Sequence, residues 1–336
     1  MSDLDAIERA LEEKNLFGYW TVGSGAAYAE PKSSFEPCLW KWQDVQDALD
    51  RTGAELGLDQ TFRRFIGFST PALNKSTTHT LILGAQLVKP GEIAEAHRHT
   101  MGAIRFVIRG GGAQTTVDGE PFPMEAGDLI TTPGGTWHDH YNGSAEPVIW
   151  LDGADRPIIK FFQIGFHEPF GERRQPLSRA VGATAHELGP LRPNGLAHNA
   201  GAFPAYRYKW EDALKALEVL GERPGDPHDG ILLRYTHPLT GGPTLPTLSC
   251  ELQMLRPGEQ TESHRHTSTA VYHVFRGAGF TEIDDVRFDW QTGDSFTAPL
   301  WRRHRHGNTG RDEAVLFVMN DRPVLEALGF YREEAA

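Results

Sequence analysis

The sequence of 336 residues lacks three features that would point to other classes of protein. It has no excess of positive charge, because 33 Lys and Arg are outnumbered by 45 Asp and Glu, and the net charge of −12 disfavours a nucleic-acid-binding surface. It has no run of about 18 apolar residues, so we expect no membrane-spanning helix. With two cysteines and an acidic first segment in place of a secretory signal, it predicts a cytoplasmic protein without a disulfide framework.

Glycine, proline and histidine, by contrast, are abundant. The 36 glycines and 22 prolines predict frequent turns and disfavour a helical bundle. Landmarks of the first half of the chain recur in the second, such as Gly127-Asp128 as Gly293-Asp294, and this duplication predicts two tandem copies of one domain. More than half of the 15 histidines lie in His-x-His triplets that follow the same repeat: His97/His99, His138/His140, His264/His266 and His304/His306.

Within each copy the pattern favours short strands separated by glycine-containing turns. Residues 103–108 and 270–275 are examples, and many such strands predict an antiparallel sandwich or barrel. A helical period of 3.6 residues is confined to the flanks of the copies. It occurs at Leu4/Ile7/Leu11, at Val45/Leu49 and at Trp210/Leu214/Leu217.

The first pair of triplets has the geometry of a metal chelate. Alternate side chains of a strand share a face, so His97 and His99 project to the same side. The segment 136–142 offers His138 or His140 as a third ligand. The alternative is a set of polar barrel residues whose hydrogen bonds are satisfied within the protein.

These motifs resemble those of the cupin superfamily. The first cupin motif is matched by Gly91, His97, His99 and Gly110, but its glutamate is absent, since Ala103 or Ile104 stands in its place. The second motif is matched at every position, by Gly127, Pro133, Gly135, His138 and Asn142. The resemblance implies a mainly β protein with two double-stranded β-helix (jelly-roll) domains, and it selects His138 over His140 as the third ligand.

We expect four segments along the chain. Residues 1–70 form an N-terminal helical extension and residues 71–170 the first cupin domain, which is the catalytic one. Residues 171–204, rich in Gly, Pro and Ala, form a linker, and residues 205–336 form the second cupin domain.

The missing glutamate changes the charge at the metal. Three neutral imidazoles leave a divalent ion with its full positive charge, whereas most related sites include a carboxylate ligand. Such an ion suits a 2-hydroxybenzoate that binds through its carboxylate and its phenolate, with a further position for dioxygen.

Beyond the superfamily, the chain resembles the gentisate 1,2-dioxygenases and their relatives that act on salicylates and 1-hydroxy-2-naphthoate. The likeness is carried by residues 97–100, 105–106, 117–120, 136–140 and 150–153, and by 263–267 in the second copy. It implies Fe(II) at His97, His99 and His138 and an extradiol-type cleavage with O2 between the carboxyl- and hydroxyl-bearing carbons. Gentisate is the first expected substrate; salicylate, its 5-chloro or 5-nitro forms and 1-hydroxy-2-naphthoate are alternatives. From another class, the alternative is a non-catalytic metal- or ligand-binding bicupin.

Further residues receive expected roles at this site. The resemblance implies that Arg105 engages the substrate carboxylate and that Gln86 lines the site, with Arg63 or Arg64 as a second positive group at its mouth. His140 is a candidate acid or base, and Asp139 and Asp152 are candidate carboxylate partners of a ligating imidazole. Trp137 is expected to pack at the substrate, while Ile82 and Gly134-Gly135 are expected to widen the pocket.

The second copy keeps a possible second metal site at His264, His266 and His304, again without a glutamate. A run of cations from Arg302 to Arg305 is expected to weaken metal binding there, and the alternative is a vestigial site that stabilises the barrel. Sheet edges and the helical N-terminal arm predict a homo-oligomer, a tetramer or a dimer.

Overall fold

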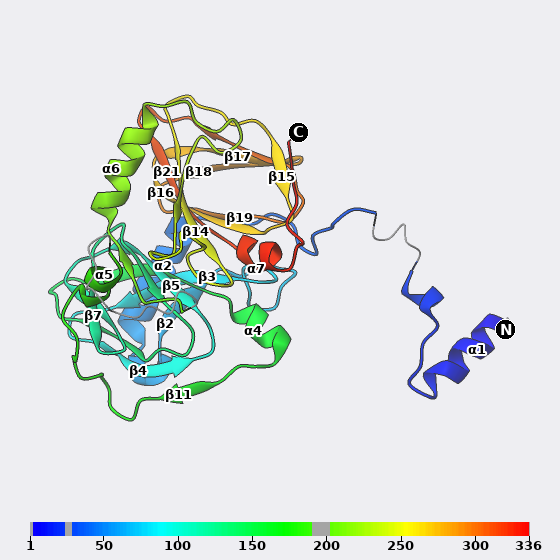
Figure 1. The fold of residues 1–336 in the computed structure, drawn as a ribbon, viewed down its shortest axis with the longest axis horizontal. Coiled ribbons are helices and arrows are strands. Elements are labelled where there is room, and N and C mark those ends of the chain that lie inside the picture. Colours follow the sequence, from blue (N-terminus) through cyan, green and yellow to red (C-terminus); the bar gives the residue numbers. More distant parts are fainter. Residues whose placement is uncertain (1–2, 24–28, 190–201, 336) are drawn as a thin grey trace. The chain divides into compact units, whose positions relative to one another are not determined.

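The structure is a computed structural model that describes residues 3–23, 29–189 and 202–335 (Figure 1). It consists of two units, residues 1–33 and residues 34–336. In the first unit, helix α1 (Asp3–Glu12) is followed by a 3-10 helix, Tyr19–Val22. The indole N–H of Trp20 donates a hydrogen bond of 2.9 Å to the Glu8 carboxylate.

The second unit contains two β-sandwich domains, each made of a six-stranded and a five-stranded antiparallel sheet. The six-stranded sheet of the first domain has the order β12 (Arg207–Tyr208), β8 (Leu129–Thr132), β5 (Ala103–Arg109), β10 (Val148–Ala154), β3 (Ile82–Val88), β2 (Arg64–Gly67). Its five-stranded sheet has the order β11 (His167–Pro169), β4 (Ile93–His99), β9 (His138–Asn142), β6 (Ala113–Val117), β7 (Glu120–Met124).

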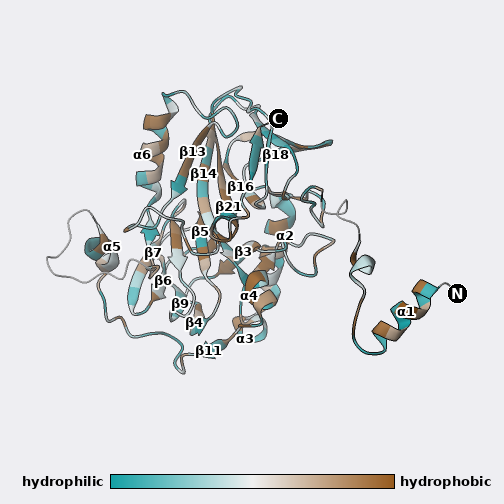
Figure 2. Ribbon diagram, turned by 45° about the vertical axis from the view of Figure 1, so that its right-hand side comes forward, coloured by the Kyte–Doolittle hydropathy of each residue, from teal (hydrophilic) through white to brown (hydrophobic). Residues whose placement is uncertain are grey.

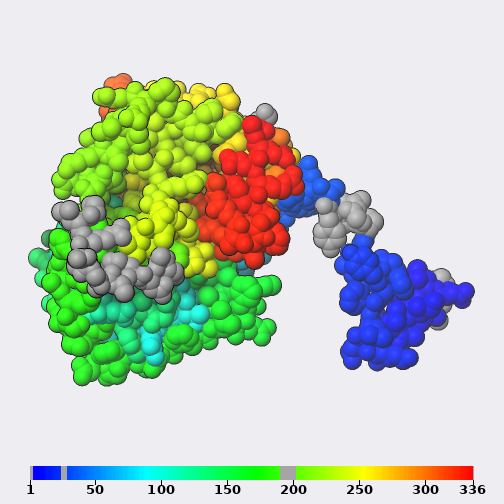
Figure 3. All heavy atoms as spheres, viewed as in Figure 1, coloured from blue at the N-terminus to red at the C-terminus, as the bar shows by residue number. Residues whose placement is uncertain are grey.

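The second domain repeats this arrangement. Its six-stranded sheet has the order β1 (Leu39–Trp40), β19 (Ser295–Ala298), β16 (Ala270–Arg276), β21 (Ala314–Asn320), β14 (Ser249–Leu255), β13 (Ile231–Tyr235). Its five-stranded sheet has the order β18 (Val286–Gln291), β17 (Ala278–Ile283), β20 (His304–Asn308), β15 (His264–His266), β22 (Glu333–Ala335). The C-terminal residues 322–335, red in Figure 3, lie on the surface of this domain.

Helices connect and flank these sheets. They are α2 (Trp42–Glu55), α3 (Leu58–Thr61), α4 (Arg156–Phe162), α5 (Ala183–Leu188), α6 (Trp210–Gly221) and α7 (Arg322–Ala327). The three helical patterns expected from periodicity correspond to α1, α2 and α6. None of the described helices is long and apolar enough to cross a membrane.

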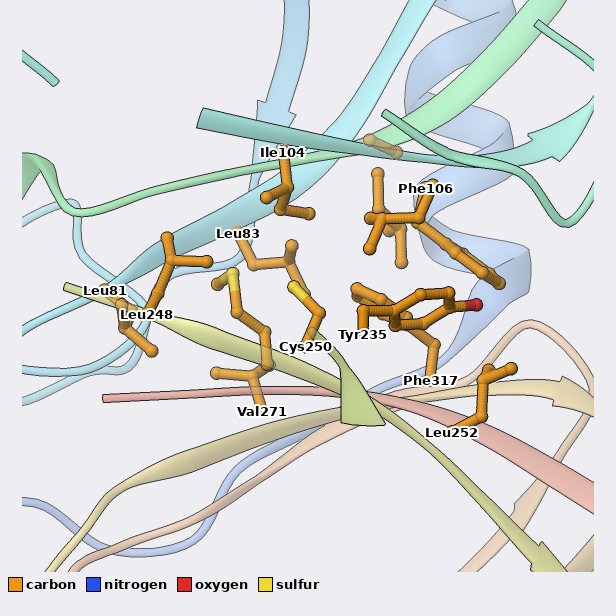
Figure 4. Close-up of a cluster of buried hydrophobic side chains, with 14 of the residues drawn as sticks. Leu81, Leu83, Ile104, Phe106, Tyr235, Leu248, Cys250, Leu252, Val271 and Phe317 are labelled. Atoms are coloured by element: carbon orange, nitrogen blue, oxygen red, sulfur yellow. The ribbon is translucent and has the colours of Figure 1, made fainter. Parts of the chain in front are cut away.

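The two domains are joined by a common hydrophobic core between their six-stranded sheets. Phe106 of the first domain stacks on Phe317 of the second, with ring centroids 4.2 Å apart and nearly parallel planes (Figure 4). Figure 2 shows hydrophobic residues on the central strands β5 and β14, which belong to these two sheets. Burying one such side chain contributes about 1.5–3 kcal/mol, so the domains stabilise one another.

Each domain also completes the sheet of the other. Strand β1, which precedes the first domain, pairs with β19 of the second, while β12, which precedes the second domain, pairs with β8 of the first. A helix that begins with a tryptophan follows each exchanged strand, α2 with Trp42 and α6 with Trp210. The sequence repeat did not reveal this exchange, because it depends on pairing between distant strands.

The repeated Gly-Asp pair holds both helices in place. The Asp294 carboxylate accepts hydrogen bonds of 2.9 Å from the Trp42 amide and 2.8 Å from the Lys41 ammonium, and Asp128 accepts one of 2.9 Å from the Trp210 amide. Gly293 has φ +94°, and a Cβ there would lie 2.5 Å from the Trp42 ring. Glycine is therefore needed both for the turn and for the close approach of the tryptophan.

The mainly β fold with two tandem cupin domains and N-terminal helices is confirmed. In the stretch predicted as a linker, residues 190–201 lie outside the described residues. Its first part lies along the first domain, where the Gln175 amide donates to Asp139 and Arg179 pairs with Glu120 at 3.1 Å.

We expect Asp294→Ala to destabilise the protein, because it removes the cap of α2 and leaves Lys41 without its buried partner. A lost cap costs about 1 kcal/mol, which in a chain of 336 residues lowers the melting temperature by about 1–2 °C. Calorimetry checks this, with the exposed Asp47→Ala of the same helix as the control. Equal melting temperatures for Asp294→Ala and the wild type would contradict the capping role.

Candidate metal centre

The pairing of β4 with β9 brings the first three histidines together. In this antiparallel register His97 lies directly opposite His138, and His99 follows two residues later on the same face. One ring nitrogen from each of the three side chains lies within 4.8 Å of the others. All three side chains are buried. The strand geometry therefore builds the three-imidazole cluster that the sequence predicts.

Backbone carbonyls fix which nitrogen of each ring faces the centre. The Nδ1–H groups of His97, His99 and His138 donate to the carbonyls of Glu95 (2.8 Å), Met101 (2.9 Å) and Thr136 (3.1 Å). The Nε2 atoms are thereby left with a lone pair. That of His138 is buried without a hydrogen-bond partner, and that of His97 lies 3.1 Å from the Arg63 guanidinium. These residues fit a divalent metal ion.

Burial also keeps the cluster uncharged. Desolvation and the nearby Arg63 lower the pKa of His97 to about 2, and desolvation with Arg105 lowers that of His99 to about 4. The pKa of His138 lies well below its ordinary value, mainly because of burial. Metal binding requires neutral imidazoles, so no proton has to be displaced at neutral pH.

A cavity of about 450 Å³ opens over this cluster, and we call it the metal cavity. Its volume exceeds what one aromatic ring needs. It is lined by Phe62, Arg63, Phe65, Ile82, Gln86, His97, His99, Met101, Ala103, Arg105, His138, Asp152, Ala154, Arg156 and His167.

Two polar side chains in the wall of the metal cavity are buried without a full set of partners. Gln86 is 1 % exposed, and neither atom of its amide makes a hydrogen bond. Arg105 is 2 % exposed, and one of its Nη groups donates to the Thr132 hydroxyl while its Nε has no partner. Burial lowers the pKa of Arg105, and Asp152, opposite it on β10, counteracts this. Such groups are expected to bind a polar ligand.

The structure places Arg63, and not Arg64, at the metal cavity. The Arg64 side chain is buried between the Leu56 carbonyl and the Glu92 carboxylate, which it contacts with two guanidinium nitrogens. The Arg63 guanidinium lies 2.8 Å from Nδ1 and 3.1 Å from Nε2 of His97. Burial lowers the pKa of Arg63 to about 10. The two neighbours face opposite ways because they enter a strand, where successive side chains alternate.

Three other expected site residues do not line the metal cavity. His140 is buried behind His138, where its Nδ1 contacts the Thr115 hydroxyl at 2.8 Å, and burial holds its pKa well below the ordinary value. Trp137 packs instead under the Arg98 guanidinium, 4.6 Å from the ring centre. Asp139 accepts hydrogen bonds from Gln175, so carbonyls and not this carboxylate orient the ligating imidazoles.

Sequence reasoning missed the strand that passes beside the cluster. Strand β11 pairs with β4, and its His167 stacks on His97 with ring centroids 5.0 Å apart. Phe62, at φ +57°, contacts both rings edge-on. No local motif marks His167, because its position depends on the pairing of β11 with β4, two strands that lie far apart in the sequence.

The second copy builds the same cluster from β15 and β20. His264 lies opposite His304, and the Nδ1 atoms of His266 and His304 face the carbonyls of Ser268 (2.9 Å) and Arg302 (3.0 Å). The Nε2 atoms of His264 and His304 have no hydrogen-bond partner.

Two features distinguish this second cluster from the first. The carboxylate of Glu333, on strand β22, takes the place of a carbonyl, 3.3 Å from Nδ1 of His264. The adjoining cavity holds only about 40 Å³. Two of the three arginines expected to disturb the site are compensated, because Arg302 pairs with Asp284 at 2.9 Å and Arg305 with Glu282 at 2.7 Å.

Comparison with known proteins agrees with this geometry. The model of the cupin domain family matches residues 84–153 and 251–320, which contain the two clusters. The 5-aminosalicylate 1,2-dioxygenase of Comamonas sp. is 40 % identical, over 99 % of this chain and 91 % of its own length. The 1-hydroxy-2-naphthoate 1,2-dioxygenase of Nocardioides sp. (strain KP7) is 39 % identical, over 98 % of this chain and 87 % of its own.

A solved structure shows the same architecture. The salicylate 1,2-dioxygenase of Pseudoaminobacter salicylatoxidans, crystallised as an adduct with gentisate, superimposes with a TM-score of 0.91 at 31 % identity. The alignment covers 100 % of this chain and 94 % of that one. Together with the full-length relatives, this match shows that the chain belongs to the gentisate and salicylate 1,2-dioxygenase family of bicupin ring-cleaving enzymes.

Proposed function

We propose that this enzyme binds Fe(II) through His97, His99 and His138 and cleaves the ring of a 2-hydroxybenzoate with O2. The bond broken joins the carboxyl-bearing and hydroxyl-bearing carbons, and both oxygen atoms enter the product. The observation that carries the proposal is the position of Gln86 and Arg105, whose buried, incompletely bonded polar groups line the same cavity as the neutral cluster.

The charge of the cluster supports this class of substrate. No carboxylate belongs to the cluster, so a divalent ion would retain its positive charge for an anionic chelating ligand. A carboxylate and a neighbouring phenolate together supply two negative charges in chelating positions. Iron held by His97, His99 and His138 would supply the redox chemistry that lets O2 react with the electron-rich ring.

The remaining side chains of the cavity orient the substrate. Gln86 and Arg105 offer N–H donors to the substrate carboxylate, and Asp152, opposite Arg105 across the strand pair, places a negative charge near the guanidinium. Arg63 supplies a second positive group beside His97. Apolar side chains, among them Phe65 and Ile82, exclude water from the ring.

A donor group para to the hydroxyl favours the reaction, because it enriches the ring in electrons. Gentisate, with a 5-hydroxyl, is the first substrate we propose, and 5-aminosalicylate carries a comparable donor. Of the residues expected to widen the pocket, Ile82 lines the metal cavity, whereas Gly134 and Gly135 do not line it.

We predict that the protein, reconstituted anaerobically with Fe(II), consumes one equivalent of O2 per substrate. Uptake should be faster with gentisate or 5-aminosalicylate than with salicylate or 5-nitrosalicylate. His99→Ala should lose both iron and activity, and the exposed His186→Ala serves as its control. An oxygen electrode and iron analysis measure these outcomes. No uptake with any of these acids or with 1-hydroxy-2-naphthoate would exclude the proposed function.

We expect Gln86→Leu and Arg105→Ala to raise KM with little change in iron content, because both side chains bind the substrate and not the metal. A hydrogen bond to a charged group is worth about 1.5–3 kcal/mol, which corresponds to roughly 10- to 150-fold in KM. Steady-state kinetics with iron analysis test this, with Gln114→Leu on β6 as the matched control. Unchanged KM in both cavity variants would remove these residues from carboxylate binding.

We further propose that His264, His266 and His304 bind a divalent ion without catalysing turnover. The same arrangement of imidazoles supports metal binding, and a cavity of about 40 Å³ is too small for an aromatic ring. Glu333 adds a carboxylate that raises the basicity of His264 as a ligand.

Metal analysis should therefore find about two ions per chain. His304→Ala should retain one ion and most of the O2 uptake but unfold at a lower temperature, because a metal that binds only the folded state stabilises it. A wild-type protein with a single ion per chain would contradict the second site. Complete loss of turnover in His304→Ala would contradict its non-catalytic role.

Self-association stays a prediction. At the end of α4 and just after it, the side chains of Phe162, Ile164 and Phe166 are exposed, and an apolar surface of this kind supports burial against a second copy. Light scattering measures the oligomeric state directly.

A further inference from the structure

A second cavity adjoins the metal cavity, and we call it the outer cavity. It has a volume of about 700 Å³ and lies between the loop of residues 72–79 and helix α4. Ile82 and Arg156 line both cavities, so these two side chains form the boundary between them. A molecule in the outer cavity is therefore next to the metal cavity.

The outer cavity is strongly cationic in an otherwise acidic chain. Lys75, Arg156 and Lys160 line it, and none of its lining residues is Asp or Glu. Among the described residues, no ion pair involves any of these three cations. The carboxylates at the N-cap positions of α4 and α7 are buried. Asp155 accepts a hydrogen bond from the Thr247 hydroxyl, and Asp321 accepts one from the Thr80 hydroxyl. With a net charge of −12 over the chain, three unpaired cations in one cavity call for a specific cause.

The second copy provides an internal comparison. Asp155-Arg156-Pro157 at the start of α4 recurs as Asp321-Arg322-Pro323 at the start of α7. In α7 the residue four positions after the arginine is Glu326, which pairs with Arg322 at 2.6 Å. In α4 the corresponding residue is Lys160.

Helix α4 thus places two like charges at positions i and i+4, an arrangement that destabilises a helix, whereas the opposite charges of α7 stabilise it. The two copies differ in the charge of this helix and also in the volume of the cavity beside their metal clusters. The positive potential is kept only in the copy whose metal cluster opens to a large cavity.

We propose that the outer cavity is the access site for the anionic aromatic acid. Lys75 and Lys160 attract the carboxylate, Arg156 transfers it past Ile82, and Arg105 with Gln86 receives it beside the metal. Charges of one sign lining a cleft raise the local concentration of an oppositely charged ligand and its association rate, and salt screens this effect. The inference rests on the proposed function, since it takes the same aromatic carboxylate as the occupant.

The test is the association rate of gentisate with the iron-loaded enzyme under anaerobic conditions. Without O2 there is no turnover, so stopped-flow fluorescence of gentisate follows binding alone. Lys160→Glu recreates the ion pair of α7 in α4, and Lys215→Glu makes the same charge change at another exposed helical lysine, on α6. Neither side chain contacts the metal cluster.

At low ionic strength we expect Lys160→Glu to lower the association rate constant roughly fivefold, with the dissociation rate constant, the iron content and kcat nearly unchanged. The difference should disappear at about 0.5 M salt, where the screening length falls to a few ångströms. Lys215→Glu should associate like the wild type. Equal association rates for Lys160→Glu and Lys215→Glu would overturn the access site alone. Failure of the wild type to bind any of the aromatic acids would overturn the proposed function, and this inference with it.

Discussion

The antiparallel register of β4 and β9 is the constraint on which the site depends. It sets His97 opposite His138, and a slip by one residue would turn every histidine of one strand to the other face of the sheet. Carbonyls two residues away then hold each Nδ1–H, so the Nε2 atoms converge without any carboxylate in the cluster. The neutral cluster, its demand for an anionic ligand and the donors around it all follow from this register.

Duplication of the sandwich has produced two sites with different access. Both copies pass a short strand beside the metal cluster, β11 in the first and β22 in the second. The first of these strands contributes His167 beside an open cavity, and the second contributes Glu333 beside a cavity of about 40 Å³. The reciprocal exchange of β1 and β12 makes the two domains interdependent, so the second copy stabilises the first whether or not it binds metal.

Local pattern was enough to predict two copies of an antiparallel sandwich or barrel and the chelating pair His97 and His99, because strand alternation is a local property of the sequence. The resemblance to the cupin motifs implied the jelly-roll fold and the third ligand. The motifs also separated His138 from His140, although both lie on the same face of β9. Which of Arg63 and Arg64 faces the cavity could not be predicted, since it depends on where β2 begins. The positions of Trp137, His167 and the outer cavity depend on segments that meet only in the folded chain.

The fate of the two oxygen atoms of O2 tests the proposed ring cleavage most directly. The iron-loaded enzyme reacts with gentisate under 18O2, and the reaction is quenched before the new carbonyl oxygen exchanges with water. Mass spectrometry then measures the mass of the product. We expect both atoms of one O2 to appear in a single ring-opened product, cleaved between the carboxyl- and hydroxyl-bearing carbons. A product that contains one labelled oxygen or none, or a ring that stays closed, would contradict the proposed cleavage.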